Sequence, residues 1–297
     1  MHVVVLSVRT GWHTDELLRA LAAREHTGAV VPYEAVIAHI GGTRTALLAS
    51  EREQLFAADA VLARFIPNGS LEQIIYRVDA LHWLEDRGVR VMNSPRAIER
   101  CVDKFYTSAL LHEAGLPTPE TIVCESVDDA MAAVRELGDV IIKPLFGSMG
   151  HGMVRVSDPD TAFRVVRALE MTRAVFYVQR VVEHRGCDVR AFVVGDHVVA
   201  AMERRASDGG WRTNISRGGD ARAIELSPEW TELALRAARA VGAEYAGVDL
   251  LPARDGTVYI LEVNGIPGWS GIQTVTETDI AGAIVDRLVG CAGAGRR

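Results

Sequence analysis

The first third of the chain alternates apolar runs with a stretch that has helical spacing. Residues 3–8, 60–65 and 89–92 are largely apolar, and each run predicts a buried strand. Residues 71–81 carry apolar side chains at helical spacing after a Gly-Ser start. This alternation of strand and helix predicts a small, mostly parallel α/β sheet over residues 1–93.

The pattern then changes to a longer helix. Ser94-Pro95 is a typical helix start, because proline is favoured at the first helical position. We expect one helix to continue from there through Asp103-Lys104 to Gly115, and a shorter helix near residues 51–58 in the preceding segment. These patterns predict three units: an N-terminal α/β domain (residues 1–93), a central lobe (94–180) and a C-terminal lobe (181–297).

A glycine-rich loop separates two predicted strands of the central lobe. The apolar run 140–142 ends in Lys143, and residues 154–156 form the second strand. Glycines let backbone N–H groups approach an anion, and a serine hydroxyl can add a contact. A Walker loop is excluded, because it needs a GK[ST] sequence followed by a helix. The loop is either an anion-binding loop or an ordinary hairpin turn, and its candidate residues are Gly147, Ser148, Gly150 and Gly152.

A β-hairpin is predicted over residues 245–268. An apolar run, an Asp-Gly turn and a second β-rich run follow one another in that order. If Asp255-Gly256 are the two central turn residues, Leu251 pairs with Ile260. The register of the whole hairpin depends on that turn.

The same register places two carboxylates face to face. Asp249 lies opposite Glu262, and Asn264 shares their face because strand side chains alternate. Two opposed carboxylates repel each other by about 3 kcal/mol at an effective dielectric constant near 20, unless a proton or a cation lies between them. Two carboxylates and an amide suit Mg²⁺ or Mn²⁺. The alternative is a solvated hairpin with scattered acids.

Arginines gather after a predicted strand at residues 174–182. A hairpin follows that strand, and its return strand ends in an Arg-Arg pair before a polar loop. Arginine forks suit phosphate or carboxylate, although a solvated hairpin end has the same composition. The candidate residues are Arg204, Arg205, Arg212, Asn214 and Arg217.

Composition excludes several classes of protein. The 32 basic and 39 acidic residues give a net charge of −7, which argues against sequence-independent binding to nucleic acid or a membrane surface. No apolar run approaches the roughly 20 residues of a membrane span. The four cysteines are scattered without a CxxC pair, which predicts no zinc site and favours a reducing, cytoplasmic location.

Together these motifs resemble the ATP-grasp superfamily, and most closely the RimK-type α-L-glutamate ligases. The segment 186–222 and the sequence LEVNGIPG look like that family nearly from end to end, and the resemblance covers residues 60–290. Residues 1–59 match only as a generic pre-ATP-grasp α/β lobe. The motifs that carry the resemblance are Asp103-Lys104, Lys143 with its glycine loop, Asp188-Val189-Arg190, residues 212–217, and Asp249 with Glu262-Val263-Asn264.

The resemblance implies an ATP-grasp fold, with a Rossmann-like pre-ATP-grasp domain and ATP held between two antiparallel lobes. Phosphate contacts would come from Lys104, Lys143, the glycine loop (Gly147, Ser148, Gly150, Gly152), Arg212 and Asn214. Adenine would meet the backbone of Gln179, Arg180, Val181 and Val182, with Asp188 near the nucleoside. The implied metal ligands are Asp249, Glu262 and Asn264, for two Mg²⁺ or Mn²⁺ ions. Arg204, Arg205 and Arg217 are the implied catalytic arginines, Arg204 or Arg205 near the amino-acid carboxylate.

The implied reaction forms an amide through an acyl phosphate and releases ADP and phosphate. Glutamate is the favoured donor, and the acceptor carboxylate belongs to a small molecule, a peptide or a protein C-terminus. One departure concerns residues 265–269, GIPGW, where the family commonly has small or polar residues before the Pro-Gly, so this loop is expected to border the substrate. Two alternatives stay open: a ligase acting on a pterin or deazaflavin coenzyme, a carrier protein or a peptide with another donor, and a non-catalytic ATP-binding regulatory module. A homo-oligomer is compatible with either.

Overall fold

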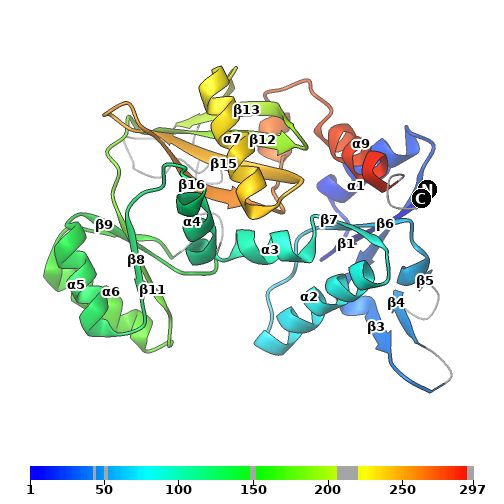
Figure 1. The fold of residues 1–297 in the computed structure, drawn as a ribbon, viewed down its shortest axis with the longest axis horizontal. Helices are drawn as coiled ribbons and strands as arrows, with labels where there is room; N and C mark the ends of the chain where they lie inside the picture. Colours follow the sequence, from blue (N-terminus) through cyan, green and yellow to red (C-terminus); the bar gives the residue numbers. More distant parts are fainter. Residues whose placement is uncertain (43–44, 50–52, 148–151, 206–219, 293–297) are drawn as a thin grey trace.

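The computed structural model describes residues 1–42, 45–49, 53–147, 152–205 and 220–292 (Figure 1).

The N-terminal domain contains β1 (His2–Ser7), α1 (Trp12–Ala22), β2 (Thr27–Pro32), β6 (Ala60–Ala63), α2 (Leu71–Asp86) and β7 (Arg90–Met92), joined by the chain's last helix, α9 (Ile280–Ala292). The four strands are parallel in the order β2-β1-β6-β7, which confirms the predicted sheet. Val3 and Val5 of β1 pack with α1 and α9, whereas Val4 and Leu6 pack with α2 on the other face.

A short antiparallel sheet, which the hydrophobic pattern did not reveal, extends this domain. It consists of β3 (Val36–His39), β4 (Ala46–Ala49) and β5 (Glu53–Gln54), with one-turn 3-10 helices η1 (Tyr33–Ala35) before it and η2 (Leu55–Ala57) after it. The helix expected near residues 51–58 is present, in the described part of that range, only as the single 3-10 turn η2, preceded by a strand. Gln54 pairs with Leu48 of β4, so the backbone there bonds to a strand.

The helix expected from Ser94-Pro95 to Gly115 is wrong as one helix. It is two helices, α3 (Pro95–Val102) and α4 (Lys104–Glu113). Asp103 between them has extended backbone angles, and its carboxylate accepts from the Tyr106 N–H at 3.1 Å, so it caps α4. The break places Lys104 at the start of a new helix.

The central lobe is an antiparallel sheet with two helices on one face (Figure 1). Its elements are β8 (Thr121–Cys124), α5 (Val127–Leu137), β9 (Val140–Lys143), β10 (Val154–Val156), α6 (Pro159–Glu170) and β11 (Phe176–Arg180), with strand order β10-β9-β11-β8. Ile142 and Val178 belong to the core under the helices. Because strand residues alternate, Lys143 and Gln179 lie on the opposite face.

The C-terminal lobe is a five-stranded antiparallel sheet in the order β14-β13-β12-β15-β16. Its elements are β12 (Cys187–Val194), β13 (His197–Arg205), β14 (Asp220–Ala223), α7 (Pro228–Val241), β15 (Tyr245–Pro252), β16 (Val258–Asn264) and the short α8 (Ser270–Gln273). Val189 and Val248 face α7 in one core cluster. On the other face, Phe192 and Tyr245 pack with the N-terminal domain. The same face also carries the charged residues Asp188, Arg190, Arg204 and Asp249.

The hairpin of β15 and β16 has a different turn from the one expected. The Ala253 N–H donates to the Thr257 carbonyl at 2.8 Å, so the loop has three residues and ends in Gly256 at φ +92°. Leu251 therefore pairs with Tyr259, and its predicted pairing with Ile260 is wrong. A bulge next to Asp249 adds one residue on β16 and brings Asp249 opposite Glu262, as predicted.

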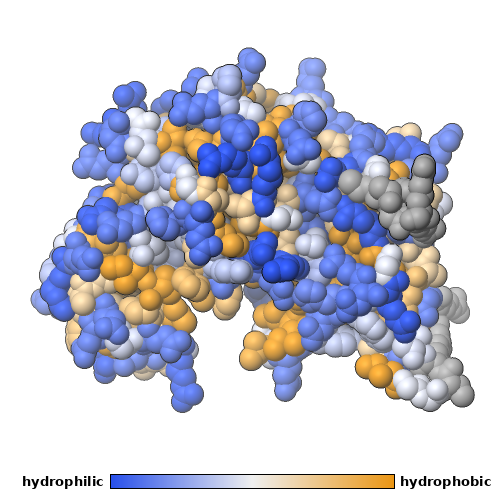
Figure 2. Space-filling view, in the orientation of Figure 1, coloured by the Kyte–Doolittle hydropathy of each residue, from blue (hydrophilic) through white to orange (hydrophobic). Residues whose placement is uncertain are grey.

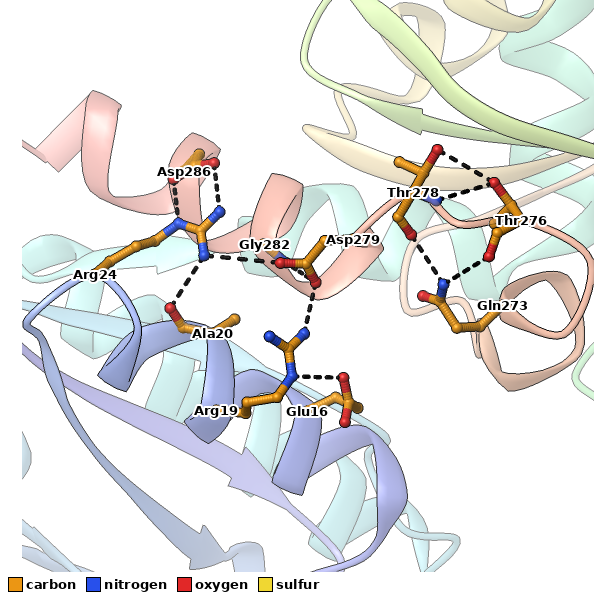
Figure 3. A network of polar contacts seen from close by, with 10 residues as sticks. All are labelled: Glu16, Arg19, Ala20, Arg24, Gln273, Thr276, Thr278, Asp279, Gly282 and Asp286. Carbon is orange, nitrogen blue, oxygen red and sulfur yellow. Dashed lines mark hydrogen bonds and ion pairs between the residues drawn. The ribbon is translucent and has the colours of Figure 1, made fainter.

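Helix α9 returns the chain to the N-terminal domain, where it packs against α1 (Figure 1). Arg24, just after α1, donates to both carboxylate oxygens of Asp286 at 2.5 and 2.8 Å, and Arg19 donates to Asp279 at 2.6 Å (Figure 3). Beneath these ion pairs, Ile284 is fully buried. The division of the chain at residues 93 and 180 remains a prediction, since α9 packs with the first unit.

The surface seen in Figure 2 is largely hydrophilic, and it is indented between the central lobe and α2. Over the residues that the structure describes, no helix combines the length and the apolar character needed to cross a membrane.

Candidate active site

A row of charged side chains crosses the polar face of the C-terminal sheet. Cross-strand pairing places Asp188 of β12 opposite Arg204 of β13, and Arg190 of β12 opposite Asp249 of β15. Asp249 in turn lies opposite Glu262 of β16. Alternation along each strand sets the face of these residues, and the strand order β13-β12-β15-β16 brings them side by side into one row.

The two arginines of the row are bonded to its carboxylates. Arg204 donates to both oxygens of Asp188 at 2.7 Å and reaches an Asp249 oxygen at 3.1 Å. Arg190 donates to both Asp249 oxygens at 2.7 Å. Although burial opposes ionisation of Asp249, Arg190 and Arg204 lower its pKa to about 2. Asp249 is therefore an anion at any physiological pH.

Glu262 is the carboxylate that this row leaves uncompensated. The row has three carboxylates and two guanidinium groups, and among the described residues no cationic nitrogen lies within 4.0 Å of Glu262. Burial, and then the charge of Asp249, raise the pKa of Glu262. Its side chain stays partly accessible, and the Asn264 amide nitrogen approaches it at 3.5 Å. The excess negative charge at Glu262 would attract a cation to this position.

Lys143 of the central lobe is held by a chain of hydrogen bonds. Its ammonium donates to the Gln179 side-chain oxygen at 2.5 Å, and the Gln179 amide donates to Thr121 at 2.9 Å and to the Tyr177 hydroxyl at 3.1 Å. Lys143 is only 9% exposed, and burial lowers its pKa to about 8 even though the charge of Glu262 acts in the opposite direction. Lys143 of the central lobe thus lies within electrostatic reach of Glu262 of the C-terminal lobe.

Lys104 connects α4 to the start of the glycine-rich loop. Its ammonium donates to the carbonyls of Leu145 at 3.1 Å and Gly147 at 2.9 Å. Burial lowers its pKa, with the Glu262 charge again acting in the opposite direction. Gly152, at φ +75°, occupies backbone space that favours glycine. Lys104 and Lys143 are the only lysines among the 32 basic residues of the chain.

Three of the other predicted site residues bond to partners outside the charged row. Arg205 is exposed and pairs with Glu203 at 2.8 Å, and Arg180 donates to Glu120 at 2.8 Å. The Val181 N–H donates to a carbonyl of its own lobe, at Asp139, and Val182 follows the end of β11. Ser148, Gly150, Arg212, Asn214 and Arg217 lie outside the described residues.

Three contributors to the site escaped the sequence reasoning. Arg190 was part of a motif but was not given a role, although it follows Asp188 by two residues and must share its face. Tyr177 orients the Gln179 amide. Asn93 is fully buried and bonds the Tyr245 and Gly265 carbonyls at 2.7 and 2.6 Å, which ties the strands of the site to the N-terminal domain. Nothing in the local sequence signals that bridge.

The expectation that residues 265–269 border the substrate stays a prediction, and the bulky residue of that loop lies in the core. Trp269 is fully buried, and its ring packs edge-on against His13 at 4.6 Å. Arg64 stacks over the same ring at 4.7 Å. The loop after Asn264 is thus fixed to the N-terminal domain by a core residue.

A hard divalent cation fits the end of the charged row. Asp249, Glu262 and Asn264 offer two carboxylates and an amide oxygen, and the excess charge of Glu262 requires a counter-ion. Across the described ranges, no group of three or more His, Cys, Asp or Glu residues forms a metal cluster. The remaining ligands would have to come from phosphate oxygens and water, as in Mg²⁺ sites of phosphoryl-transfer enzymes.

Comparison with known proteins agrees with this geometry. Residues 1–98 match a model of the RimK pre-ATP-grasp domain, and residues 101–288 match one of the RimK-like ATP-grasp domain. A tetrahydromethanopterin:alpha-L-glutamate ligase of Methanosarcina acetivorans is 39% identical over 72% of this chain and 74% of its own length. A "probable alpha-L-glutamate ligase" of Chromohalobacter salexigens is 36% identical over 97% of this chain and 95% of its own. The ATP-grasp ligase PsnB, solved with a minimal precursor, Mg and ADP, has a TM-score of 0.75 at 24% identity and covers 98% of both chains.

Proposed function

Because the chain belongs to the RimK-like ATP-grasp family, and is thus an ATP-dependent carboxylate–amine ligase, we propose that it joins L-glutamate to an acceptor carboxylate. The donor is proposed because both curated relatives are named as glutamate ligases. The proposed cofactor is a pair of Mg²⁺ or Mn²⁺ ions. One relative is named for tetrahydromethanopterin, a small molecule, and PsnB has also been solved with a precursor peptide. The acceptor is therefore proposed to be a carboxylate on a small molecule or on a peptide.

The position of Glu262, whose charge reaches both Lys104 of α4 and Lys143 of the central lobe, carries this proposal. The Glu262 charge acts on the pKa of both Lys104 and Lys143. Every other basic residue except histidine is arginine, so a compact ammonium stands only at these two positions. The two ammonium groups can bind phosphate oxygens, and the uncompensated carboxylate can bind a divalent cation that also contacts the phosphates.

The proposed steps need no protein nucleophile. An acceptor carboxylate oxygen attacks the terminal phosphorus of ATP, the bond to the bridging oxygen breaks, and ADP leaves. The glutamate amine then attacks the acyl carbon of the acyl phosphate, phosphate departs, and the amine loses a proton. Lys104 and Lys143 would neutralise charge on the phosphoryl oxygens. A divalent cation held by Asp249, Glu262 and Asn264 would supply more positive charge there.

The charged row has a supporting role in this proposal. Arg190 and Arg204 fix Asp249 as an anion and hold its carboxylate in one orientation. The side-chain oxygen of Gln179 accepts a hydrogen bond from the Lys143 ammonium and so holds it in one orientation. The nucleotide contacts of the glycine loop, of residues 179–182, and of Asp188, Arg212 and Asn214 remain predictions. So do the substrate contacts of Arg204, Arg205 and Arg217.

Lys143→Ala is expected to weaken ADP binding by about tenfold or more, because it removes a buried ammonium from the phosphate side. Isothermal titration calorimetry of the full chain measures the affinity directly. Arg164→Ala, an exposed position on α6, is the matched loss of a positive charge from the same lobe and should leave ADP affinity unchanged. Equal affinities of wild type and Lys143→Ala would mean that this lysine does not hold phosphate.

ADP binding is also expected to depend on pH. Lys143 is charged below its pKa of about 8 and neutral above it. Measured without divalent metal, ADP affinity should therefore fall between about pH 7 and about pH 9.5, by up to about tenfold per unit above pH 8. Lys143→Arg keeps its charge over that range, and its ADP affinity should stay level. A level profile in the wild type would contradict the assignment.

A further inference from the structure

A cavity of about 280 Å³, away from the candidate active site, lies in the N-terminal domain. Residues 7–14, which connect β1 to α1, form one side, and Arg64 and Phe65, directly after β6, form the other. The cavity is thus at the carboxyl ends of β1 and β6. The chain leaves β1 for β2 on one side of the sheet, whereas β6 pairs with β1 on the other. Open parallel sheets bind ligands at such switch points.

The cavity presents positive charge without an acid to balance it. Arg64 is only 5% exposed, and its guanidinium donates to the Tyr245 hydroxyl at 3.2 Å and the Pro267 carbonyl at 3.0 Å. Its third neighbour, the Trp269 ring, is also neutral. Within the described part of the chain, no carboxylate lies at ion-pair distance from Arg64 or from the exposed Arg9. None of the lining residues is acidic. A buried charge in this position is stabilised by an anion.

His13, also on the cavity wall, does not change the net positive charge of the cavity lining. The Trp269 N–H donates to its Nε2 at 3.1 Å, so Nε2 is an acceptor and the ring proton lies on Nδ1. Burial, and then Arg64, lower the pKa of His13 to about 4. The imidazole is therefore neutral at physiological pH and adds polarity without charge.

The cavity adjoins the candidate metal site along the chain. Arg64 bonds the carbonyl of Pro267, which follows Asn264 by three residues, and three residues span at most about 11 Å. The cavity is slightly smaller than the roughly 300–1,000 Å³ of typical small-molecule sites. It therefore suits one end of a substrate whose other end reaches the transfer site.

We propose that this cavity binds a carboxylate of the acceptor substrate, with Arg64 and Arg9 as counter-ions. The inference rests on the proposed ligase function. The donor is a poor candidate, because free glutamate carries an ammonium group, and the cavity offers two guanidinium groups and no acid to meet it. An acceptor with a second carboxylate, away from the one that is ligated, would bring negative charge to these guanidinium groups without an ammonium group. Trp12 and Phe65, both partly exposed, add an apolar wall.

N-acetyl-L-glutamate is the probe for this site, because its blocked amine makes it anionic like an acceptor. Calorimetric titration of the full chain should show binding that Arg9→Glu weakens by about tenfold or more. Arg9 is exposed, so the variant leaves the buried Arg64 contacts in place. Arg135→Glu, an exposed position on α5, is the matched charge reversal and should bind the probe as the wild type does. The neutral N-acetyl-L-glutamine amide should not bind.

Four outcomes would overturn the proposal: no binding of the probe at millimolar concentration, equal loss in both variants, binding of inorganic phosphate alone, or a stronger Arg9 dependence for free L-glutamate than for the probe. ADP titration of the same variants separates this result from the ligase function. ADP affinity should be unchanged in Arg9→Glu, because the phosphate site belongs to Lys104 and Lys143. Failure of ADP to bind the wild type would remove the proposed function while leaving an anion site in the cavity.

Discussion

Glu262→Gln is expected to lower the rate of ligation by about a thousandfold or more, equivalent to about 4 kcal/mol of transition-state stabilisation, while the protein stays folded. Both oxygens of Asp249 are already bonded to arginine. The excess negative charge of the row therefore belongs to Glu262, and an amide removes it. Phosphate release supported by an acceptor-containing extract measures the rate, and circular dichroism checks the fold.

Stability measurements distinguish lost metal binding from a damaged fold. Without metal, Glu262→Gln should be at least as stable to urea as the wild type, because it relieves the repulsion with Asp249. With Mg²⁺ and ADP at a hundredfold excess over Kd, the wild type should gain about 2.7 kcal/mol and the variant less. Glu232→Gln, on the exposed surface of α7, is the matched control and should behave as wild type in both assays. Full activity in Glu262→Gln would contradict the metal assignment.

Arg204→Met is expected to destabilise the protein by about 3–5 kcal/mol, because it leaves the buried carboxylates of Asp188 and Asp249 without this cation. Urea denaturation measures the change. Arg205→Met is the matched control: Arg205 is exposed and pairs only at the surface, so its loss should cost about 0–1 kcal/mol. If Arg205 binds the donor, that variant should instead raise the Michaelis constant for glutamate more than the constant for ATP. Equal stability of the two variants would contradict the buried row.

Local pattern was sufficient to predict the carboxylate pair and the lysine beside the glycine loop. Lys143 ends an apolar run, and strand alternation fixes its face. Asp249 and Glu262 are opposite for a reason that the sequence did not reveal. The turn is one residue longer than expected, and the bulge compensates by one residue on β16. Their opposition was thus predicted with an incorrect intermediate register.

The rest of the site depends on contacts between segments that are far apart in sequence. Arg190 meets Asp249 only because β12 lies beside β15, 59 residues away. Asn93 bonds the Tyr245 carbonyl 152 residues later. Arg19 of α1 bonds Asp279, just before α9, 260 residues later. The cavity beside Arg64 combines loops that follow two different strands. Sequence spacing carries no information about such neighbours, because the order of strands in a sheet is set by packing of the whole domain.

The nucleotide product tests the central claim most directly. Lys104, Lys143 and the Asp249–Glu262–Asn264 site are proposed to act on the terminal phosphate of ATP, so turnover should yield ADP and inorganic phosphate in equal amounts. Phosphorus NMR of a reaction with ATP, Mg²⁺, L-glutamate and deproteinised cell extract distinguishes the products. With hydroxylamine in place of glutamate, the acyl phosphate should be trapped as a hydroxamate of the acceptor. ADP together with a hydroxamate is the predicted result, and stoichiometric AMP with pyrophosphate would contradict attack at the terminal phosphate.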